Sequence, residues 1–185
     1  MKHTIRSDRS SIQPIIKADL FASVDATIKN SHSTIVIVPH VCNNANLFGV
    51  GFAAAVANHY PIVKDNYHLL GKPFLSKNLG YAQFILAKEN KSKDNKLIFA
   101  NMIAQNGTIS KNNPRPINYF SLCKSMNLVA KKAHDLKSLD TTVQIHAPKF
   151  GSGLAGGNWL FISHLIEDIW GDLEVFVYDI GSSRS

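Results

Sequence analysis

Apolar and polar positions along the chain follow two alternating patterns. Short apolar runs rich in β-branched residues and bounded by turn formers predict strands, at residues 12–17, 34–39, 81–87, 96–103, 142–147 and 173–178. Longer stretches with an apolar period of 3.6 residues predict helices, at residues 51–59, 62–70, 116–136 and 158–170. Strands that alternate with covering helices predict an α/β fold: a three-layer α/β/α sandwich with a central mixed β-sheet.

Turn and cap residues sharpen the ends of these elements. Pro116 suits a first helical turn, where its missing amide donor costs nothing, and Gly171 suits the end of the last helix. Residues 72–80 and 106–115 are polar or rich in glycine, proline and asparagine, which predicts two long surface loops. Loops of this kind often border a binding site.

Length and composition indicate one ordinary globular domain. The chain has 185 residues, of which 45% are hydrophobic and 18% charged. We expect a single domain over residues 12–180, with short polar tails at 1–11 and 181–185. No apolar stretch approaches the roughly 20 residues of a bilayer span, and the polar N-terminus lacks the apolar run of a signal peptide. We therefore expect a cytoplasmic monomer without a membrane partner.

Cysteine content and net charge restrict the chemistry only in part. Cys42 and Cys123 can form neither a disulfide framework nor a zinc site of paired cysteines, so no metal or other cofactor is expected. The net charge of +7 favours polyanions, which include nucleic acid and any ligand with a pyrophosphate. Lysines in residues 88–96 and 131–137 are equally well explained by a solvated loop and a solvated helix face. Charge alone does not identify a ligand.

A first glycine loop lies between a buried strand and a helix, in residues 39–54. Gly49 and Gly51 allow the backbone to approach a ligand closely, and the helix that begins near Gly51 directs free amides and its positive dipole end at an anion. An ordinary glycine turn is the plainer alternative. A dinucleotide-binding fingerprint also matches Gly49 to Ala54, but residues 40–47 separate it from the strand and no acidic residue follows near position 70.

A second glycine loop separates the strand at 142–147 from the last helix. It contains four glycines within residues 151–157, together with the hydroxyl of Ser152, and predicts another anion site lined by backbone. Two loops at the same strand ends face each other across a crevice in open α/β sheets, which is where such sheets bind ligands. The pair predicts a phosphate-containing ligand more strongly than either loop alone.

Several motifs together resemble the macrodomain family over residues 13–180. Ala18-Asp19-Leu20 is similar to the family's Gly-Asp-Ile motif, with alanine for glycine, and the last predicted strand ends in Val177-Tyr178-Asp179. His40 precedes Gly49 by nine positions, as in the branch of ADP-ribose 1″-phosphate phosphatases and terminal ADP-ribose protein glycohydrolases. The spacing from Pro148 to Trp159 resembles the second loop of the same branch, with Phe150 for isoleucine and Ser152 for cysteine.

The resemblance implies ADP-ribose or a derivative as ligand, and possible partners that carry ADP-ribose on a macromolecule. It implies that Asp19 accepts a hydrogen bond from the adenine amine and that Tyr178 stacks on adenine. By itself, a tyrosine in a last strand is more often a core residue, and an aspartate after a first strand is as often a helix or turn cap as a ligand-binding residue. The expected ligand-binding residues are Asp19, Leu20, Cys42, Gly49, Val50, Gly51, Phe52, Phe150, Gly151, Ser152, Gly153, Leu154, Ala155 and Tyr178.

The expected catalytic residues are His40, Asn43 and Asn44. A histidine beside the distal ribose could orient or deprotonate water, while asparagines could hold ribose hydroxyls or an oxyanion. Cys42 is expected in the wall of the site rather than as a nucleophile, because no cysteine-phosphatase motif surrounds it. Ala155 stands where the glycohydrolases that deglutamylate proteins have an aspartate, which argues against their lysine-adduct mechanism. Asn101-Met-Ile-Ala-Gln105 resembles a stretch of bacterial and phage-like members and either contacts ligand or braces the sheet.

Three functions remain open at this point. The first is an enzyme that removes the 1″-phosphate from ADP-ribose 1″-phosphate or cleaves another ADP-ribosyl derivative. The second is a binder of ADP-ribose, of ADP-ribosylated macromolecules or of an NAD-derived signal, without catalysis. The third is nucleic-acid binding through basic surface, for which the sequence shows no platform that combines basic and aromatic residues.

Overall fold

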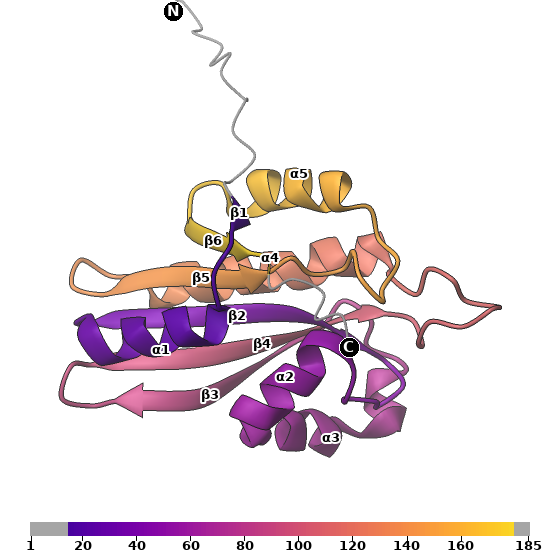
Figure 1. The fold of residues 1–185 in the computed structure, drawn as a ribbon, viewed down its shortest axis with the longest axis horizontal. Helices are drawn as coiled ribbons and strands as arrows, with labels where there is room; N and C mark the ends of the chain where they lie inside the picture. The colour runs from indigo at the N-terminus through magenta and orange to yellow at the C-terminus, as the bar shows by residue number, and fades with distance from the viewer. Residues whose placement is uncertain (1–14, 180–185) are drawn as a thin grey trace, which may run out of the picture.

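The computed structural model describes residues 15–179, which form one six-stranded sheet and five helices (Figure 1). The sheet order is β1-β6-β5-β2-β4-β3, and every neighbouring pair is parallel except β3 and β4, which are antiparallel. The elements are β1 (Ile15–Ile16), α1 (Leu20–Asn30), β2 (Thr34–Asn43), α2 (Gly51–His59), α3 (Pro61–Leu75), β3 (Ala82–Asn90), β4 (Asn95–Gln105), α4 (Tyr119–Leu136), β5 (Thr142–Pro148), α5 (Trp159–Trp170) and β6 (Glu174–Tyr178).

Helices cover both faces of the sheet, because the inner strands are apolar on both sides. One core cluster joins α4 and α5 to β2, β4, β5 and β6, and it contains the fully buried Trp170, whose Nε1–H donates to the Met126 carbonyl at 2.9 Å. The other cluster joins α1, α2 and α3 to β2, β3 and β4, with Tyr67 fully buried. The predicted three-layer α/β/α arrangement with a mixed central sheet is therefore confirmed.

Helix α1 was not predicted, although the sequence carries its features. Asp19 caps it, since Oδ1 accepts from the backbone amides of Phe21 at 2.8 Å and Ala22 at 3.2 Å. Its buried residues recur with helical spacing and pack against the sheet; they are Leu20, Phe21, Val24 and Ile28. Asp25 and Thr27 are weak helix formers, so they lower the local helix propensity of this segment.

Two further boundaries differ from the predictions. Helix α3 continues through Gly71, whose φ of 72° marks a kink, to Leu75, so the loop predicted at 72–80 is wrong in its first half. Helix α4 begins at Tyr119 rather than at Pro116, because the Asn118 side chain caps it by accepting from the Ser121 amide. The predicted end of the last helix is confirmed, with Gly171 after Trp170.

Some predicted segments reach outside the described residues. Of the strand predicted at 12–17, only Ile15–Ile16 is described as β1, and the tails predicted at 1–11 and 181–185 lie outside the described range. Between residues 15 and 179, none of the helices has the length and apolar character needed to cross a bilayer.

Candidate functional site

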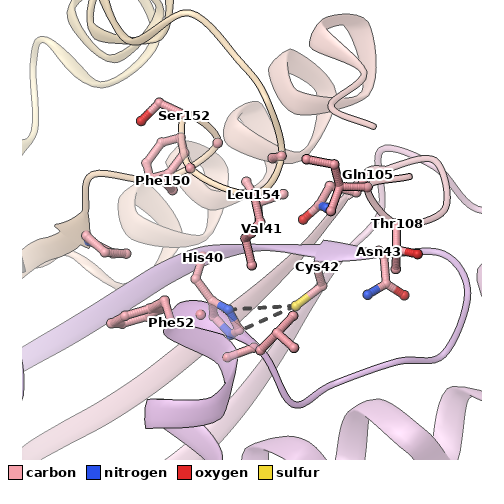
Figure 2. Close-up of a pocket in the computed structure, with 18 of the residues that line it drawn as sticks. His40, Val41, Cys42, Asn43, Phe52, Gln105, Thr108, Phe150, Ser152 and Leu154 are labelled. Atoms are coloured by element: carbon pink, nitrogen blue, oxygen red, sulfur yellow. Dashed lines mark hydrogen bonds between the residues drawn. The ribbon is translucent and has the colours of Figure 1, made fainter. Parts of the chain in front are cut away.

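A cavity of about 410 Å³ opens at the carboxyl ends of β2, β4 and β5, between the two glycine loops. Figure 2 shows His40 and Cys42 on β2 across from Phe150, Ser152 and Leu154 of the second loop. The lining residues come from five segments, namely residues 40–43, 47–53, 105 with 108–109, 148–155, and 179. Cavities of this size bind small ligands and cofactors, typically at such strand ends.

Asn43 fixes the start of the first loop with its side-chain amide. Its Oδ1 accepts from the backbone amides of Ala45 at 3.0 Å and Leu47 at 3.2 Å, and its Nδ2 donates to the Leu47 carbonyl at 2.7 Å. The Tyr67 hydroxyl of α3 donates to the Asn43 carbonyl at 2.7 Å and lies 3.1 Å from Oδ1. Asn43 lines the cavity, yet these bonds use both ends of its amide to shape the loop.

Asn44 ties the first loop to the segment after β4. Its Oδ1 accepts from the Gly107 amide at 2.7 Å, and its Nδ2 donates to Asn106 Oδ1 at 3.1 Å. Asn44 is not among the residues that line the cavity. The contact instead holds the segment that carries Thr108 and Ile109, both of which line it.

The first loop ends at the N-terminus of α2, which lines the cavity. Val50 is the N-cap in extended conformation and makes no side-chain cap hydrogen bond, while Gly51 has a φ of 57°. An uncapped helix start directs first-turn amides and the positive end of the helix dipole outward, which suits an anion. The backbone of Gly49 to Ala53 is thus arranged as an anion cradle.

The second loop owes its shape to close backbone packing. The Gly157 amide donates to the Gly151 carbonyl at 2.8 Å, and a Cβ at Gly157 would lie 2.4 Å from that same oxygen. Gly151 and Gly156 have φ values of 76° and 71°, in the left-handed region. Leu154 closes this loop toward the first one, since its Cδ1 would lie 3.5 Å from a Cβ at Gly51.

His40 ends a ladder of polar side chains across three strands. Asn101 of β4 is paired in register with both His40 of β2 and Gln83 of β3. Asn101 Nδ2 donates to Gln83 Oε1 at 3.0 Å, so its Oδ1 faces His40 and accepts from His40 Nε2–H at 2.6 Å. Gln83 Nε2 then donates to the Asn66 carbonyl of α3 at 2.9 Å. Asn101 is fully buried and braces His40 from below the cavity.

Burial keeps both His40 and Cys42 uncharged. The His40 side chain is 1% exposed, and its desolvation lowers its pKa from 6.5 to about 4 despite the bond to Asn101. The unprotonated Nδ1 of the imidazole accepts a long hydrogen bond from the Cys42 thiol, with Sγ at 3.8 Å (Figure 2). Desolvation raises the pKa of the Cys42 thiol far above its usual range. His40 is therefore a neutral hydrogen-bond acceptor, and Cys42 is an unreactive thiol in the cavity wall.

Three residues expected to bind ligand by resemblance lie outside the cavity lining, and two of them, Asp19 and Tyr178, were expected at adenine. Asp19 caps α1 through Oδ1, and Leu20 is fully buried in the core. The Tyr178 ring is 3% exposed, and its hydroxyl donates to His146 Nδ1 at 2.8 Å on a stacked imidazole. In this structure the Tyr178 ring is covered by protein rather than presented as a stacking surface.

The remaining residues expected to bind ligand all line the cavity, and the structure adds others. Gln105, whose role the sequence left open, lines it, as do Thr108 and Ile109 of the predicted loop at 106–115. Lys149 and Asp179 flank predicted residues and also line it. No residue of the segment 72–80 does. Within residues 15–179, no three histidine, cysteine, aspartate or glutamate side chains cluster as a metal site would require.

Comparison with known proteins gives matches among solved structures. No family model and no curated protein sequence matches the chain. A protein of unknown function from Bacteroides thetaiotaomicron is 27% identical, with a TM-score of 0.71 over 90% of this chain and 96% of that one. A macrodomain protein from Streptomyces coelicolor is 27% identical, with a TM-score of 0.62 over 82% of this chain and 100% of that one. DarTG from Thermosipho africanus, solved in complex with ADP-ribose, is 15% identical, with a TM-score of 0.57 over 82% of this chain and 39% of that one. The fold is the macrodomain fold that the sequence predicted.

Proposed function

We propose that this protein binds ADP-ribose or a close derivative in the cavity between its two glycine loops. The observation that carries the proposal is the pairing of an uncapped helix start at Gly51 with a second backbone-lined loop at Gly151, whose Leu154 approaches Gly51. Two facing sets of amides suit the two phosphates of one ligand. Similarity to a macrodomain protein and to a DarTG solved with ADP-ribose supports the same ligand.

The cavity also suggests an orientation for that ligand. With the diphosphate between the loops, the distal ribose lies toward His40, Cys42 and Gln105. The adenine end then lies toward the start of α1, where Asp19 Oδ2 is the oxygen that the helix cap does not use. The polar groups near the distal ribose are acceptors and amides rather than acids, which suits hydroxyl recognition.

The reaction we propose is removal of the 1″-phosphate from ADP-ribose 1″-phosphate, with transfer of the phosphoryl group to water. The ladder through Asn101 leaves His40 Nδ1 as the acceptor, so His40 orients a water molecule or accepts its proton. A nucleophilic role for Cys42 is disfavoured, because its pKa is strongly raised. Asn43 and Asn44 act by holding the loop that surrounds the sugar.

A second candidate is binding without catalysis, and a specific observation favours it. Asp179 is the only carboxylate among the described residues that line the cavity, and it comes from the end of β6 rather than from β2. With a pKa of about 4, His40 cannot donate a proton near neutral pH. A site of this kind can bind ADP-ribose, but its described residues include no good proton donor for a leaving group.

Phosphate release from ADP-ribose 1″-phosphate by the intact protein and by His40→Ala separates the two candidates. ADP-ribose binding is measured on both by calorimetric titration. His146→Ala serves as a matched control, because His146 is also buried with a pKa of about 4 but does not line the cavity. Turnover lost in His40→Ala alone, with binding retained, supports the phosphatase. Binding without turnover by the intact protein supports the binder, and absence of ADP-ribose binding contradicts both.

A further inference from the structure

The fold assembles an aromatic and cationic surface from parts that are separate in the sequence. Three cations lie over aromatic rings at the N-terminal ends of α4 and α5: Arg115 is 5.2 Å from the Tyr119 ring centre, Lys124 is 5.7 Å from Phe120, and Lys149 is 5.5 Å from Trp159. Such pairs occur about once per 70–80 residues in proteins, so three at one edge are a concentration. We call these six residues, together with Phe161, the aromatic–cationic arc.

Part of the arc is joined by direct contacts and lies next to the cavity, and Phe120 and Lys124 follow Tyr119 along α4. Phe161 of α5 packs edge-on against Tyr119 of α4, with ring centres 4.7 Å apart, and the Asn158 amide donates to the Tyr119 hydroxyl at 2.7 Å. Arg115 borders the second glycine loop, because its Cα would lie 3.1 Å from a Cβ at Gly156. Lys149 belongs to the arc and to the cavity lining. A chain bound along the arc would therefore pass the cavity mouth.

Rings in the arc are exposed where a soluble protein would ordinarily bury them. Phe120 is 75% exposed and Phe161 is 45% exposed. Exposed rings beside cations are suited to planar groups that also carry negative charge, because the ring stacks while the cation meets the charge. An acidic peptide supplies the charge without the planar groups.

The two chain segments that contribute the arc carry charge of one sign, although Asp179 lines the cavity together with Lys149. Residues 95–134 and residues 141–166, which contain the arc, include no aspartate or glutamate. The first turns of α4 and α5 are likewise free of acids, so their helix dipoles add to the positive potential. Polyanions are attracted to such a region and anionic proteins of mixed charge much less.

We propose that the aromatic–cationic arc binds single-stranded nucleic acid. Unpaired bases expose the planar faces that stack on Phe120 and Phe161, and the phosphates between them meet Arg115, Lys124 and Lys149. Paired bases in a duplex hide these faces. The inference goes beyond the proposed ADP-ribose site and holds without it, although the two sites adjoin at Lys149.

Fluorescence anisotropy of a labelled oligothymidylate of about 16 nucleotides tests the arc. Phe120→Ala and Phe161→Ala should each weaken binding about tenfold. An abasic oligonucleotide of equal length should bind the intact protein far more weakly, because it keeps the phosphates and lacks the bases. Arg115→Ala and Lys124→Ala should each reduce the slope of log affinity against log salt concentration by about 0.7.

Matched controls lie before the amino ends of β4 and β5, whereas the arc lies near the carboxyl ends of these strands. Lys91→Ala removes one exposed charge in the turn between β3 and β4, and Leu139→Ala removes one fully exposed apolar side chain before β5. Both should leave oligonucleotide affinity within about twofold. Thermal unfolding confirms that each variant is folded.

Several results would overturn the proposal. They are absence of oligonucleotide binding at low salt, equal losses in Lys91→Ala and the arc variants, equal binding of the abasic chain, and displacement by polyglutamate at matched charge. ADP-ribose binding is measured separately on the same proteins by calorimetry. Absence of ADP-ribose binding with oligonucleotide binding intact would contradict the proposed function and support the arc. Absence of oligonucleotide binding with ADP-ribose binding intact would contradict the arc and support the proposed function.

Discussion

The two glycine loops make the same kind of cradle in physically different ways. The first loop is shaped by side-chain amides, above all Asn43, which bonds Ala45, Leu47 and Tyr67 around one turn. The second is shaped by backbone packed against backbone, with Gly157 donating to the Gly151 carbonyl at a distance that excludes any side chain. The first loop depends on side-chain amides that are present, and the second depends on the absence of a side chain at Gly157.

The difference tells which substitutions each loop tolerates. In the first loop, a Cβ at Gly49 would meet nothing within 4 Å, so small residues fit there while loss of an amide does damage. In the second loop, Gly153 has the same open space, whereas Gly157 has none. Glycine count therefore does not measure how much a loop relies on glycine.

Gly157→Ala should have the largest effect. Its Cβ would lie 2.4 Å from the Gly151 oxygen and 3.1 Å from Ile162 Cδ1, so the backbone must move. We expect the free energy of unfolding to fall by about 2–4 kcal/mol and ADP-ribose affinity to fall at least tenfold. Gly153→Ala is the control and should change stability by less than about 1 kcal/mol. Urea unfolding and calorimetric titration measure both, and equal behaviour of the two variants would refute the packing argument.

Asn43→Ala should have the next largest effect. It leaves the backbone amides of Ala45 and Leu47 without their side-chain acceptor, at a cost of about 2–3 kcal/mol in unfolding free energy, while the Tyr67 hydroxyl keeps its bond to the backbone carbonyl of residue 43. Asn127→Ala removes an exposed asparagine that bonds only within α4, and should cost under about 0.5 kcal/mol. Thermal unfolding of both variants checks this. A small effect of Asn43→Ala would mean that the first loop keeps its shape without its amide.

The loops could be found in the sequence because their residue types carry the physics locally. Glycines between a strand and a helix indicate an anion cradle from local sequence alone. Both cradles follow parallel strands, so they lie together at the carboxyl ends of the sheet. The buried start of α1 could also have been found, since Asp19 is a good cap before an apolar pattern of helical spacing.

Other features depend on registers and packing that no local pattern contains. The ladder from His40 through Asn101 to Gln83 exists because three strands pair at those positions, and separations of 61 and 18 residues hide it in the sequence. The cover over Tyr178 comes from α1 and β5 together. The same holds for the aromatic–cationic arc, which joins residues around 115–124 to residues around 149–161.

Acid should destabilise the fold through two histidines, His40 and His146, that burial keeps neutral. His40 and His146 have pKa values of about 4, against 6.5 when unfolded. Below pH 6.5 the two imidazoles bind protons in the unfolded chain but not in the folded one. The free energy of unfolding is therefore highest above that pH and declines toward pH 4. Each histidine should contribute a loss of up to about 1.4 kcal/mol per pH unit in that window.

Urea unfolding at several pH values between 7 and 4.5 measures this decline. His146→Gln should reduce the slope without touching the cavity, and His40→Gln should reduce it to a similar extent. Asn127→Ala provides the control, because it removes no titratable group and should leave the slope unchanged. An unaltered slope in both buried variants would show that these imidazoles are solvated.

Tyr178→Phe should have the smallest effect on ligand binding. It tests whether this buried ring stacks on adenine, as its sequence motif implies. The ring is 3% exposed, so a stacking role would require it to leave the core. Removing the hydroxyl breaks the bond to His146 Nδ1 and should cost about 1 kcal/mol of stability. Tyr178→Phe retains the aromatic ring, so a second variant, Tyr178→Leu, is needed to remove any stacking while keeping an apolar side chain. ADP-ribose affinity within about twofold in both variants would place the adenine contact on other residues near Asp19, whereas a loss of tenfold in Tyr178→Leu alone would mean that ligand binding opens the core at β6.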